Sequence, residues 1–316
     1  MRRRWRTWLF LMVMGAALMA LPGCGAKAGD PSHSATPREV ASSSALVVKV
    51  LDVGQGDAIL IRTGKETILL DAGDTDEVSK LKAALDREGI KVIDKLIITH
   101  PHRDHLGGAA MVFQNYTVKA VYDNGQTATP KFYRDYLKTI KAKHIPYQTL
   151  RDGDALDFGG GVSFTVLSPT EAMVKEGGHG EDGKINLNLN SLVGRLTYGS
   201  FAMMLTGDAE KPTEEGILKR HTGSDLRCQV LKSGHHGSKT SSRPAFLKAV
   251  KPEVALISCG AGNSYHHPHP SVRRLYEKQH IDFYRTDVNG TITVESDGKT
   301  YRVTSERGAK NSDKGN

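Results

Sequence analysis

The chain has 316 residues, with 43 Lys or Arg against 35 Asp or Glu, and its formal net charge is +8. This length can bury a substantial core, in one large domain or in two small ones. Outside residues 1–23 the chain keeps 39 basic and 35 acidic residues, so its charge there is +4. A surplus this small excludes identifying a polyanionic partner from charge alone.

The first 23 residues look like an export signal and not like part of the fold. Four arginines precede the apolar run Trp8 to Ala20, which is short for a membrane-spanning helix, and Cys24 follows Pro22 and Gly23. The pattern resembles a bacterial lipoprotein signal. This resemblance implies cleavage before Cys24 and lipid anchoring of that cysteine to the outer face of the cell membrane. An ordinary cleaved signal peptide and an uncleaved anchor stay open as alternatives, and both also imply export.

Residues 24–44 are rich in Ala, Ser, Pro and Gly without an apolar period, which predicts a flexible tether. We expect one folded domain at residues 45–309 and a disordered tail at residues 310–316. Within the domain, the β-rich runs 46–51, 58–62 and 67–70 are separated by glycine turns and predict an antiparallel meander. A helix is then expected to follow Asp74 and to stop at Gly89.

A strand predicted at residues 95–99 leads into the most distinctive stretch of the chain. His100-Pro101-His102-Arg103-Asp104-His105 places three imidazoles and a carboxylate on one turn, before a helix predicted at residues 106–113. Divalent metals such as zinc are held by His nitrogen and carboxylate oxygen, and a loop lets ligands two or three residues apart converge. One or two histidines would fit a solvated turn, but this spacing predicts a metal site.

Strand and helix patterns alternate through the rest of the chain. We expect strands at residues 118–122, 162–167, 192–197, 201–205, 229–232 and 254–258. Helices are expected before Pro146 and at residues 213–221, 244–250 and 271–279. The runs 291–295 and 300–304 flank Asp297-Gly298 and predict a hairpin. The predicted fold class is α/β, with two mixed sheets and helices outside them. Cys228 and Cys259 are either paired or buried as free thiols.

Four further stretches place ligand-capable residues at the ends of predicted strands, namely residues 71–74, 206–208, 233–238 and 265–270. Loops gather into sites at such strand ends, along one edge of a layered α/β fold. Each stretch alone has a structural explanation, such as a helix cap at Asp208. Together with the turn at residues 100–105 they predict one site.

The His-x-His-x-Asp-His motif, the strand-end Asp208 and the His-His-Gly-Ser turn at residues 235–238 resemble the metallo-β-lactamase superfamily. The runs 51–57, 205–210 and 234–240 are similar to the extracellular hydrolase domain of the ComEC competence proteins, and the similarity extends from about residue 48 to residue 304. It implies a four-layer αββα sandwich with a two-metal site. It also implies that this one domain is free-standing and tethered by lipid.

Carried over position by position, the resemblance implies a set of metal ligands. The first ion would be held by His100 and His102. The second would be held by Asp104, by His105 and by either His235 or His236, and Asp208 would bridge both ions. We favour His235 as the ligand because it comes first after the strand, which would leave His236 nearer the substrate.

The chain departs from the superfamily pattern at the first metal. A third histidine is usual between the positions of Asp104 and Asp208, but the matching stretch here is Leu187 to Ser191, which contains no histidine. Asn190 would orient substrate or bind metal weakly, and His179 is a second candidate for the missing ligand. Occupancy of the first site is therefore open. Mixed His and carboxylate ligands suit zinc, and the carboxylate-rich second site also suits manganese.

The resemblance also implies how the reaction would proceed. A metal pair lowers the pKa of a bound water, and Asp104 would accept the proton of that water or orient it. The candidates to protonate the leaving group are His236, His267 and His269. Contacts to the substrate are expected from Asn190, Ser191, Ser238 and Lys239, and phosphate oxygens could be held by Lys232, Lys239 and Arg243.

Three functions follow as hypotheses. The first is an exported, lipid-anchored, metal-dependent phosphodiesterase or nuclease that acts on extracellular DNA in a competence-like role. The second is a hydrolase of another exported substrate, such as a cell-wall phosphodiester, a lactam or a lactone. The third is a metal-poor, tethered module that binds DNA or assembles with other proteins. The partners implied are DNA or another phosphodiester, and the membrane through Cys24.

Overall fold

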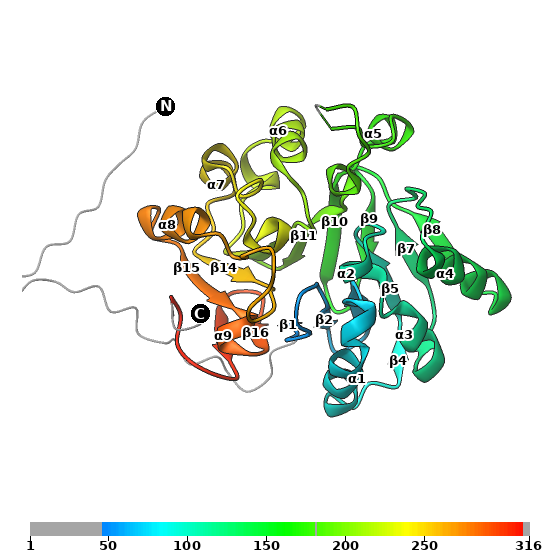
Figure 1. Ribbon diagram of the computed structural model, residues 1–316. Helices are drawn as coiled ribbons and strands as arrows, with labels where there is room; N and C mark the ends of the chain where they lie inside the picture. Colours follow the sequence, from blue (N-terminus) through cyan, green and yellow to red (C-terminus); the bar gives the residue numbers. More distant parts are fainter. Residues whose placement is uncertain (1–45, 181, 312–316) are drawn as a thin grey trace, which may run out of the picture. The chain divides into compact units, whose positions relative to one another are not determined.

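Two mixed sheets form the centre of the computed structural model, which describes residues 46–180 and 182–311 (Figure 1). The strands of the larger sheet are β1 (Leu46–Val50), β2 (Ile59–Arg62), β3 (Thr67–Leu70), β5 (Lys95–Ile98), β7 (Val121–Asp123), β8 (Tyr147–Thr149), β16 (Ile292–Ser296) and β17 (Tyr301–Ser305). Their order across the sheet is β17-β16-β1-β2-β3-β5-β7-β8. The sheet therefore joins strands from both ends of the described chain.

The second sheet is built from the middle and later parts of the chain. Its strands are β9 (Ala155–Asp157), β10 (Val162–Ser168), β11 (Val193–Tyr198), β12 (Phe201–Leu205), β13 (Val230–Lys232), β14 (Val254–Ile257) and β15 (Asp282–Arg285). Their order is β15-β14-β13-β12-β11-β10-β9. A separate parallel pair joins β4 (Val92–Ile93) and β6 (Thr117–Val118).

The helices connect these strands and cover the sheets. They are α1 (Val78–Arg87), α2 (Arg103–Leu106), α3 (Ala109–Asn115), α4 (Lys131–Ala142), α5 (Glu171–Lys175), α6 (Lys211–Arg220), α7 (Pro244–Val250), α8 (Pro270–Lys278) and α9 (Thr286–Asn289). Four 3-10 turns, η1 to η4, cover Thr75–Glu77, Leu187–Asn190, Gly223–Asp225 and Gly234–Gly237. None of the helices among the described residues is long and apolar enough to cross a membrane.

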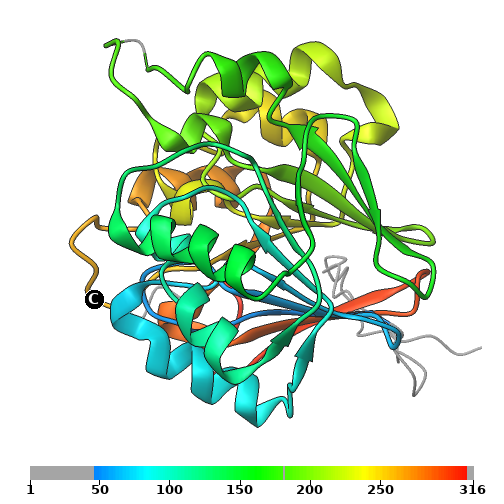
Figure 2. The same cartoon turned by 90° about the vertical axis from the view of Figure 1, so that its right-hand side faces the viewer.

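Three apolar cores separate four layers. One core lies between the sheets, a second lies under α1, α3 and α4 on the larger sheet, and a third lies under α6, α7 and α8 on the smaller sheet. Alternation along β2 shows how the sequence builds these layers, because Ile59 and Ile61 join the first core and Leu60 joins the second. Figure 2 shows the cyan helices and the yellow helices on opposite sides of the sheets. The predicted αββα sandwich is confirmed.

Local patterns predicted most of the strands correctly. The meander β1-β2-β3 is antiparallel, and β16 and β17 form the predicted hairpin. The strand predicted at residues 118–122 was wrong in one respect, because it splits into β6 and β7, which belong to different sheets. The short strands β8, β9 and β15 were not predicted, since three or four residues carry too little periodicity to distinguish them from loops.

Several predicted features lie outside the described residues. These are the signal segment, Cys24 and the tether, so their assignment stays a prediction. The predicted tail begins at Lys310, but Lys310 and Asn311 both contact β15. The Lys310 ammonium pairs with Asp282 at 2.6 Å, and the Asn311 N–H donates to the Phe283 carbonyl at 2.8 Å. These two residues therefore belong with the folded part.

The carboxyl ends of the parallel strands position the loops that matter for function. In the larger sheet β3, β5 and β7 run parallel, and in the smaller sheet β12, β13, β14 and β15 do so. The stretches that the sequence singled out follow β3, β5, β12, β13 and β14. Whether these stretches form one site therefore depends on how their loops pack together.

A buried carboxylate joins two of the outer helices and carries a prediction about stability. Glu214 on α6 accepts the backbone N–H groups of Ser242 and Arg243, at 2.6 and 2.9 Å, just before α7 begins. Burial raises the pKa of Glu214 to about 7, although these hydrogen bonds lower it. Its proton is therefore bound more tightly in the folded chain than in the unfolded chain.

We expect the wild-type protein to lose stability, relative to Glu214→Gln, as pH rises. The stabilising proton is fully present below the unfolded pKa near 4.5 and is lost as pH passes the folded value near 7. A difference of two to three pKa units corresponds to about 3 kcal/mol. Urea unfolding of both metal-free proteins at pH 5 and pH 8 measures this difference. An identical pH dependence in the two proteins would contradict it.

Candidate metal centre

The turn after β5 brings three histidines to one place. His100 follows the strand, His102 immediately precedes α2, and His105 lies on α2 itself. His100 Nε2 and His102 Nδ1 are only 2.9 Å apart. A turn followed by a short helix thus lets side chains two and three residues apart face one another, as the spacing in the sequence predicted.

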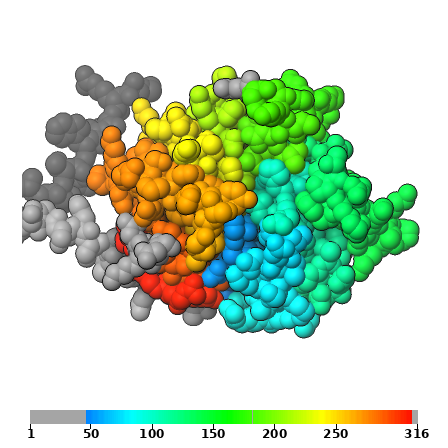
Figure 3. Space-filling view, in the orientation of Figure 1, coloured from blue at the N-terminus to red at the C-terminus, as the bar shows by residue number. Residues whose placement is uncertain are grey.

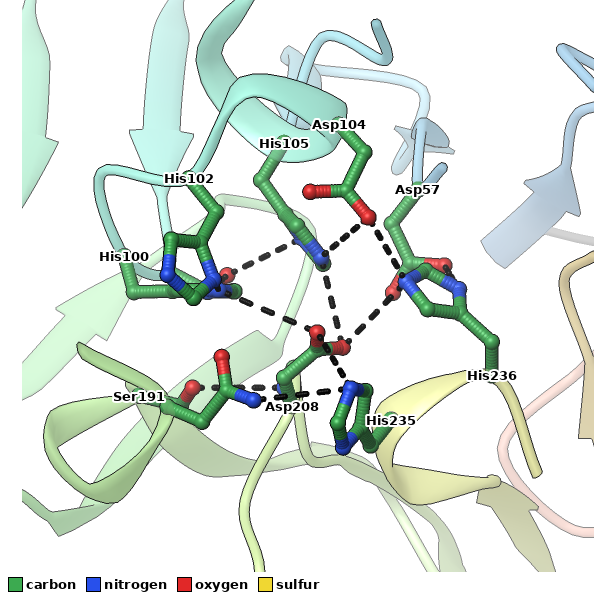
Figure 4. A network of polar contacts seen from close by, with 12 residues as sticks. Asp57, His100, His102, Asp104, His105, Ser191, Asp208, His235 and His236 are labelled. Atoms are coloured by element: carbon green, nitrogen blue, oxygen red, sulfur yellow. Dashed lines mark hydrogen bonds and ion pairs between the residues drawn. The ribbon is translucent and has the colours of Figure 1, made fainter. Parts of the chain in front are cut away.

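Asp208, which follows β12, lies among these histidines and a later one (Figure 4). Its Oδ1 is 3.3 Å from His105 Nε2 and 3.5 Å from His236 Nε2. Its Oδ2 is 3.8 Å from His100 Nε2. The side chain is nearly inaccessible, with 2% exposed, and the Asp208 N–H donates to the Ser191 hydroxyl at 3.2 Å. One held carboxylate therefore faces histidines from two segments of the chain, the turn after β5 and the turn after β13.

Two groups of ligand atoms share Asp208, and the atoms of each group lie within 4.8 Å of one another. The first group is Asp104, His105, Asp208 and His236, and the second group is His100, His102 and Asp208. In the first group, the buried atoms His105 Nε2, Asp208 Oδ1 and His236 Nε2 face one another as ion pairs but make no hydrogen bond of regular geometry to the described residues. Buried polar atoms without partners are costly, and a metal ion would satisfy all three. The residues therefore fit a divalent metal.

Carboxylates dominate the electrostatics of this cluster. Burial opposes charge on His105, but Asp208 and Asp71 outweigh it and raise the pKa of His105 well above its ordinary value. Burial opposes charge on His236 in the same way, and Asp208 and Asp57 raise the pKa of His236 to about 10. Surroundings that protonate histidines also attract a metal cation, which displaces these protons when it binds.

Buried acceptors fix the rings of the same two histidines. Asp71 Oδ2 lies 2.8 Å from His105 Nδ1, and Thr99 donates to the Asp71 carboxylate through its N–H at 2.7 Å and its hydroxyl at 2.8 Å. His236 Nδ1 donates to the Ser258 carbonyl at 2.9 Å and lies 3.5 Å from Asp57 Oδ1. Because Nδ1 is engaged in each ring, Nε2 is the atom that faces Asp208.

His235 stands at the edge of the cluster, with 23% of its side chain exposed. Its Nδ1 lies 3.1 Å from Glu210 Oε1 and 3.2 Å from the Thr240 hydroxyl. Its Nε2 is 3.8 Å from Asp208 Oδ2 and 3.5 Å from Asn188 Nδ2. His235 thus bonds to a neighbouring carboxylate and belongs to neither group of ligand atoms.

All members of both groups fall within residues 51–261, which match the family model described as the metallo-beta-lactamase superfamily. The chain belongs to the metallo-beta-lactamase superfamily. This match covers two thirds of the chain, and the αββα layers and the shared carboxylate are its structural counterparts. The resemblance stated from the sequence motifs is therefore confirmed.

Curated relatives place the chain near competence proteins of this superfamily. It is 32% identical to ComE operon protein 3 of Bacillus subtilis (strain 168) over 78% of this chain and 32% of that protein. It is 33% identical to competence protein ComA of Neisseria gonorrhoeae over 90% of this chain and 38% of that protein. The chain thus spans about a third of the length of these two relatives.

Two further comparisons have lower sequence identity. Exodeoxyribonuclease WalJ of Streptococcus pneumoniae serotype 2 (strain D39 / NCTC 7466) is 29% identical over 36% of this chain and 44% of that protein. Among solved structures, the CmlA beta-hydroxylase E377D mutant matches with a TM-score of 0.51 and 14% identity, over 81% of this chain and 55% of that chain. At this identity the structural match shows a shared fold alone.

Of the two histidines in the His-His-Gly-Ser turn, His236 joins a group of possible ligand atoms and His235 joins neither group, whereas order after the strand had favoured His235. Both residues have left-handed backbone, with φ of 48° for His235 and 54° for His236. This geometry turns His236 inward against the Ser258 carbonyl and leaves His235 at the edge beside Glu210. Order after the strand was therefore a poor criterion, because the turn reverses the direction of successive side chains.

The stretch that replaces the usual third histidine of the superfamily also needs correction. The pocket lined by Asp104, Asp208 and His236, here called the metal pocket, is also lined by Asn188. Asn190 is buried away from it and donates to the Met173 carbonyl at 3.2 Å. Ser191 is fully buried and accepts the N–H of Asp208, so it holds a ligand and does not contact substrate. The amide available to a substrate is therefore that of Asn188.

His179, the second candidate for the missing ligand, does not reach the cluster. It is exposed, its Nδ1 contacts the Glu176 carbonyl at 2.6 Å, and it belongs to neither ligand group. Among the described residues, the group of His100 and His102 thus has no third histidine. Its ligands are fewer than those of the Asp104 group, which has two histidines and two carboxylates.

The candidates for proton transfer are placed differently from one another. Asp104 lines the metal pocket of about 460 Å³ and is 24% exposed, with its Oδ2 3.2 Å from His236 Nε2, so it can contact a water there. His267 also lines it, but burial and the nearby His236 lower the pKa of His267 to about 3, so it carries no proton to donate as a cation. His269 accepts the Lys239 N–H at 3.2 Å and does not line this pocket.

The cations proposed to hold phosphate divide into buried and exposed ones. Lys232 is fully buried, and its ammonium pairs with Asp57 Oδ2 at 2.8 Å, so it cannot reach a substrate. Lys239 and Arg243 are exposed and line a groove next to the metal pocket. Ser238 is buried and its hydroxyl accepts a hydrogen bond within its own turn. Of the side chains expected to contact phosphate, Lys239 and Arg243 therefore remain accessible.

Five residues with clear positions at the site were given no individual role from the sequence, although each lies in a stretch that the sequence singled out. They are Asp57, Asp71, Asn188, Glu210 and Tyr265. Asp71 was visible as a polar strand end, and Asp57 lies in a glycine turn that indicated only a turn. That these carboxylates support histidines depends on long-range packing, which local patterns do not contain.

Proposed function

We propose that this chain is an exported, lipid-anchored metal-dependent phosphodiesterase that cleaves DNA outside the membrane. The observation that carries the proposal is the pair of ligand groups that share Asp208. Cys24 would carry the lipid anchor. Zinc suits the mixed His and carboxylate ligands, and manganese suits the group that contains Asp104.

The residues of the chain would divide the work as follows. His100, His102 and Asp208 would hold one ion, and Asp104, His105, His236 and Asp208 would hold the other. When bound, two such ions polarise a phosphodiester and activate water at neutral pH. Asp104 is the most exposed carboxylate of the cluster, with 24% exposed, and would orient the attacking water and take up its proton.

The substrate class is supported by relatives and by charge. One relative is named competence protein ComA, another is named ComE operon protein 3, and a third is named as an exodeoxyribonuclease. The groove beside the metal pocket carries Lys239 and Arg243, which suit an anionic chain. Lactams and lactones lack the repeated charge for which such cations are suited.

A metal analysis joined to a substrate panel tests the proposal. We expect the purified chain to contain one to two equivalents of metal and to cleave single- or double-stranded DNA with zinc or manganese. A chelator should abolish cleavage and added metal should restore it. Cleavage of bis(p-nitrophenyl) phosphate without cleavage of DNA would favour a different exported phosphodiester. Less than about one equivalent of metal would favour the metal-poor module.

A further inference from the structure

The loop between β14 and α8 presents an exposed aromatic ring at the metal pocket. Tyr265 is 61% exposed, lines this pocket and stacks on His267, with ring centroids 5.7 Å apart and planes 20° apart. His267 in turn stacks on His236 at 6.1 Å and 28°. Tyr265 is therefore the outer member of a stack that ends at a metal-binding histidine.

Single exposed apolar side chains are common on protein surfaces, so the exposure of Tyr265 matters because of its position at the site. Only four large hydrophobic side chains are exposed among the described residues, namely Val92, Tyr147, Ile185 and Tyr265. Tyr147 donates its hydroxyl to Asp123 at 2.7 Å, whereas the Tyr265 hydroxyl has no hydrogen bond to the described residues. Tyr265 and Ile185 line the two neighbouring cavities at the site. Apolar side chains that line such cavities are suited to contact a ligand.

A basic groove of about 750 Å³ lies beside the metal pocket. Its exposed cations are Lys184, Lys211, Lys239 and Arg243. Neither Lys239 nor Arg243 forms an ion pair within residues 46–180 and 182–311, so both charges are free to meet phosphate. Two acidic residues line the groove. Glu210 accepts hydrogen bonds from Asn186 and Asn188, and Asp182 pairs with Lys184 at 3.7 Å.

The groove and the metal pocket share a wall. Glu210 and Thr240 line the groove, and both contact His235, which lines the metal pocket. On the other side, Gly260 at the start of the Tyr265 loop donates its N–H to the Gln55 side chain at 3.1 Å. In Figure 3 the orange loop after β14 lies against the blue segment after β1. Tyr265 and the cations thus line two cavities that adjoin through His235, Glu210 and Thr240.

We infer that the site is built for a single-stranded nucleic acid, with one base stacked on Tyr265 and the adjoining phosphates in the groove on Lys239 and Arg243. The inference rests on the proposed function and names its substrate more closely. Aromatic rings bind unpaired bases because every base has a flat face, and cations bind the backbone whatever its sequence. Bases within a duplex are stacked on one another and cannot reach Tyr265 without being extruded. A cell-wall phosphodiester has no flat base to stack.

The test measures binding without cleavage. A fluorescein-labelled oligothymidylate of about ten nucleotides is titrated with the full chain in a chelator, and fluorescence anisotropy gives the Kd. Tyr265→Ala should weaken binding about tenfold, and Tyr265→Phe should bind like the wild type. An oligomer of the same length that lacks bases should bind equally to the wild type and to Tyr265→Ala.

The cations give a separate readout. Replacing both Lys239 and Arg243 by glutamine should reduce the slope of log Kd against log salt concentration by about 1.4, with or without bases. The control replaces Lys138 and Lys299, two exposed lysines that do not line either cavity, and should leave the slope unchanged. The single-strand preference should appear as weaker binding of a duplex of the same length.

Several results would overturn the inference. These are equal affinity of the wild type and Tyr265→Ala for oligothymidylate, equal loss with the oligomer that lacks bases, or no binding of oligothymidylate by the wild type. If DNA is cleaved but Tyr265→Ala binds normally, the inference fails and the proposed function stands. If bases are bound through Tyr265 but DNA is not cleaved with metal, the proposed function fails and the binding site stands.

Discussion

Replacing Asp208 by asparagine should remove nearly all hydrolytic activity and reduce the metal content of the chain. Asp208 Oδ1 faces His105 and His236, and its Oδ2 faces His100, so one charge serves both groups of ligands. Asparagine keeps the shape and the backbone bond to Ser191 but removes this charge. Loss of several kcal/mol of transition-state stabilisation corresponds to a rate decrease of about 10³-fold or more.

The measurement pairs metal analysis by mass spectrometry with the hydrolysis rate of the same sample. Asp225→Asn is the matched control, because Asp225 is an exposed aspartate in η3, outside both ligand groups, and should leave metal content and rate unchanged. Full activity in Asp208→Asn would show that the observed cleavage comes from a contaminant. Normal metal content with no activity would instead mean that Asp208 acts in the reaction and is not needed to bind the metal.

The fold was predictable where neighbouring residues decide the structure. Alternating apolar residues and glycine turns predicted β1, β2 and β3 and the hairpin of β16 and β17, because such pairs need only a short turn. The pairing of β1 with β16 brings Val50 beside Ile292 and could not be predicted from local pattern. Loop closure over such distances depends on the whole core, not on the residues that pair.

The site, like the fold, was predictable where residues close together in the sequence decide the structure. The turn His100 to His105 carries its ligands within six residues, so spacing alone indicated a metal. Choosing between His235 and His236 required the backbone angles of the turn, which are left-handed at both. Lys232 was expected to hold phosphate oxygens because it stands beside the site in sequence, but it is fully buried. Burial of a polar side chain depends on what packs over it, and Asp57 lies 175 positions earlier.

The buried pair of Asp57 and Lys232 should dominate the stability of the metal-free protein. Both side chains are fully buried, and Lys232 has as its other partner only the Ser233 carbonyl, at 3.0 Å, among the described residues. Asp57→Asn would leave this ammonium without a counter-charge, which costs about 3–5 kcal/mol of unfolding free energy. Urea unfolding in the presence of a chelator measures this loss without a contribution from bound metal.

The two partners of the pair should not be equivalent. Burial opposes charge on Asp57, but Lys232 and His236 together hold the pKa of Asp57 below its usual value. Lys232→Met therefore leaves Asp57 with His236, 3.5 Å away, as a second cation, and should cost less than Asp57→Asn. The double variant should recover much of the loss, because no unpaired charge stays buried. Asp135→Asn, which breaks the exposed pair of Asp135 and Lys131 on α4, is the control and should change stability little. Additive losses in the double variant would mean that Asp57 acts through His236 and the glycine turn, and not through Lys232.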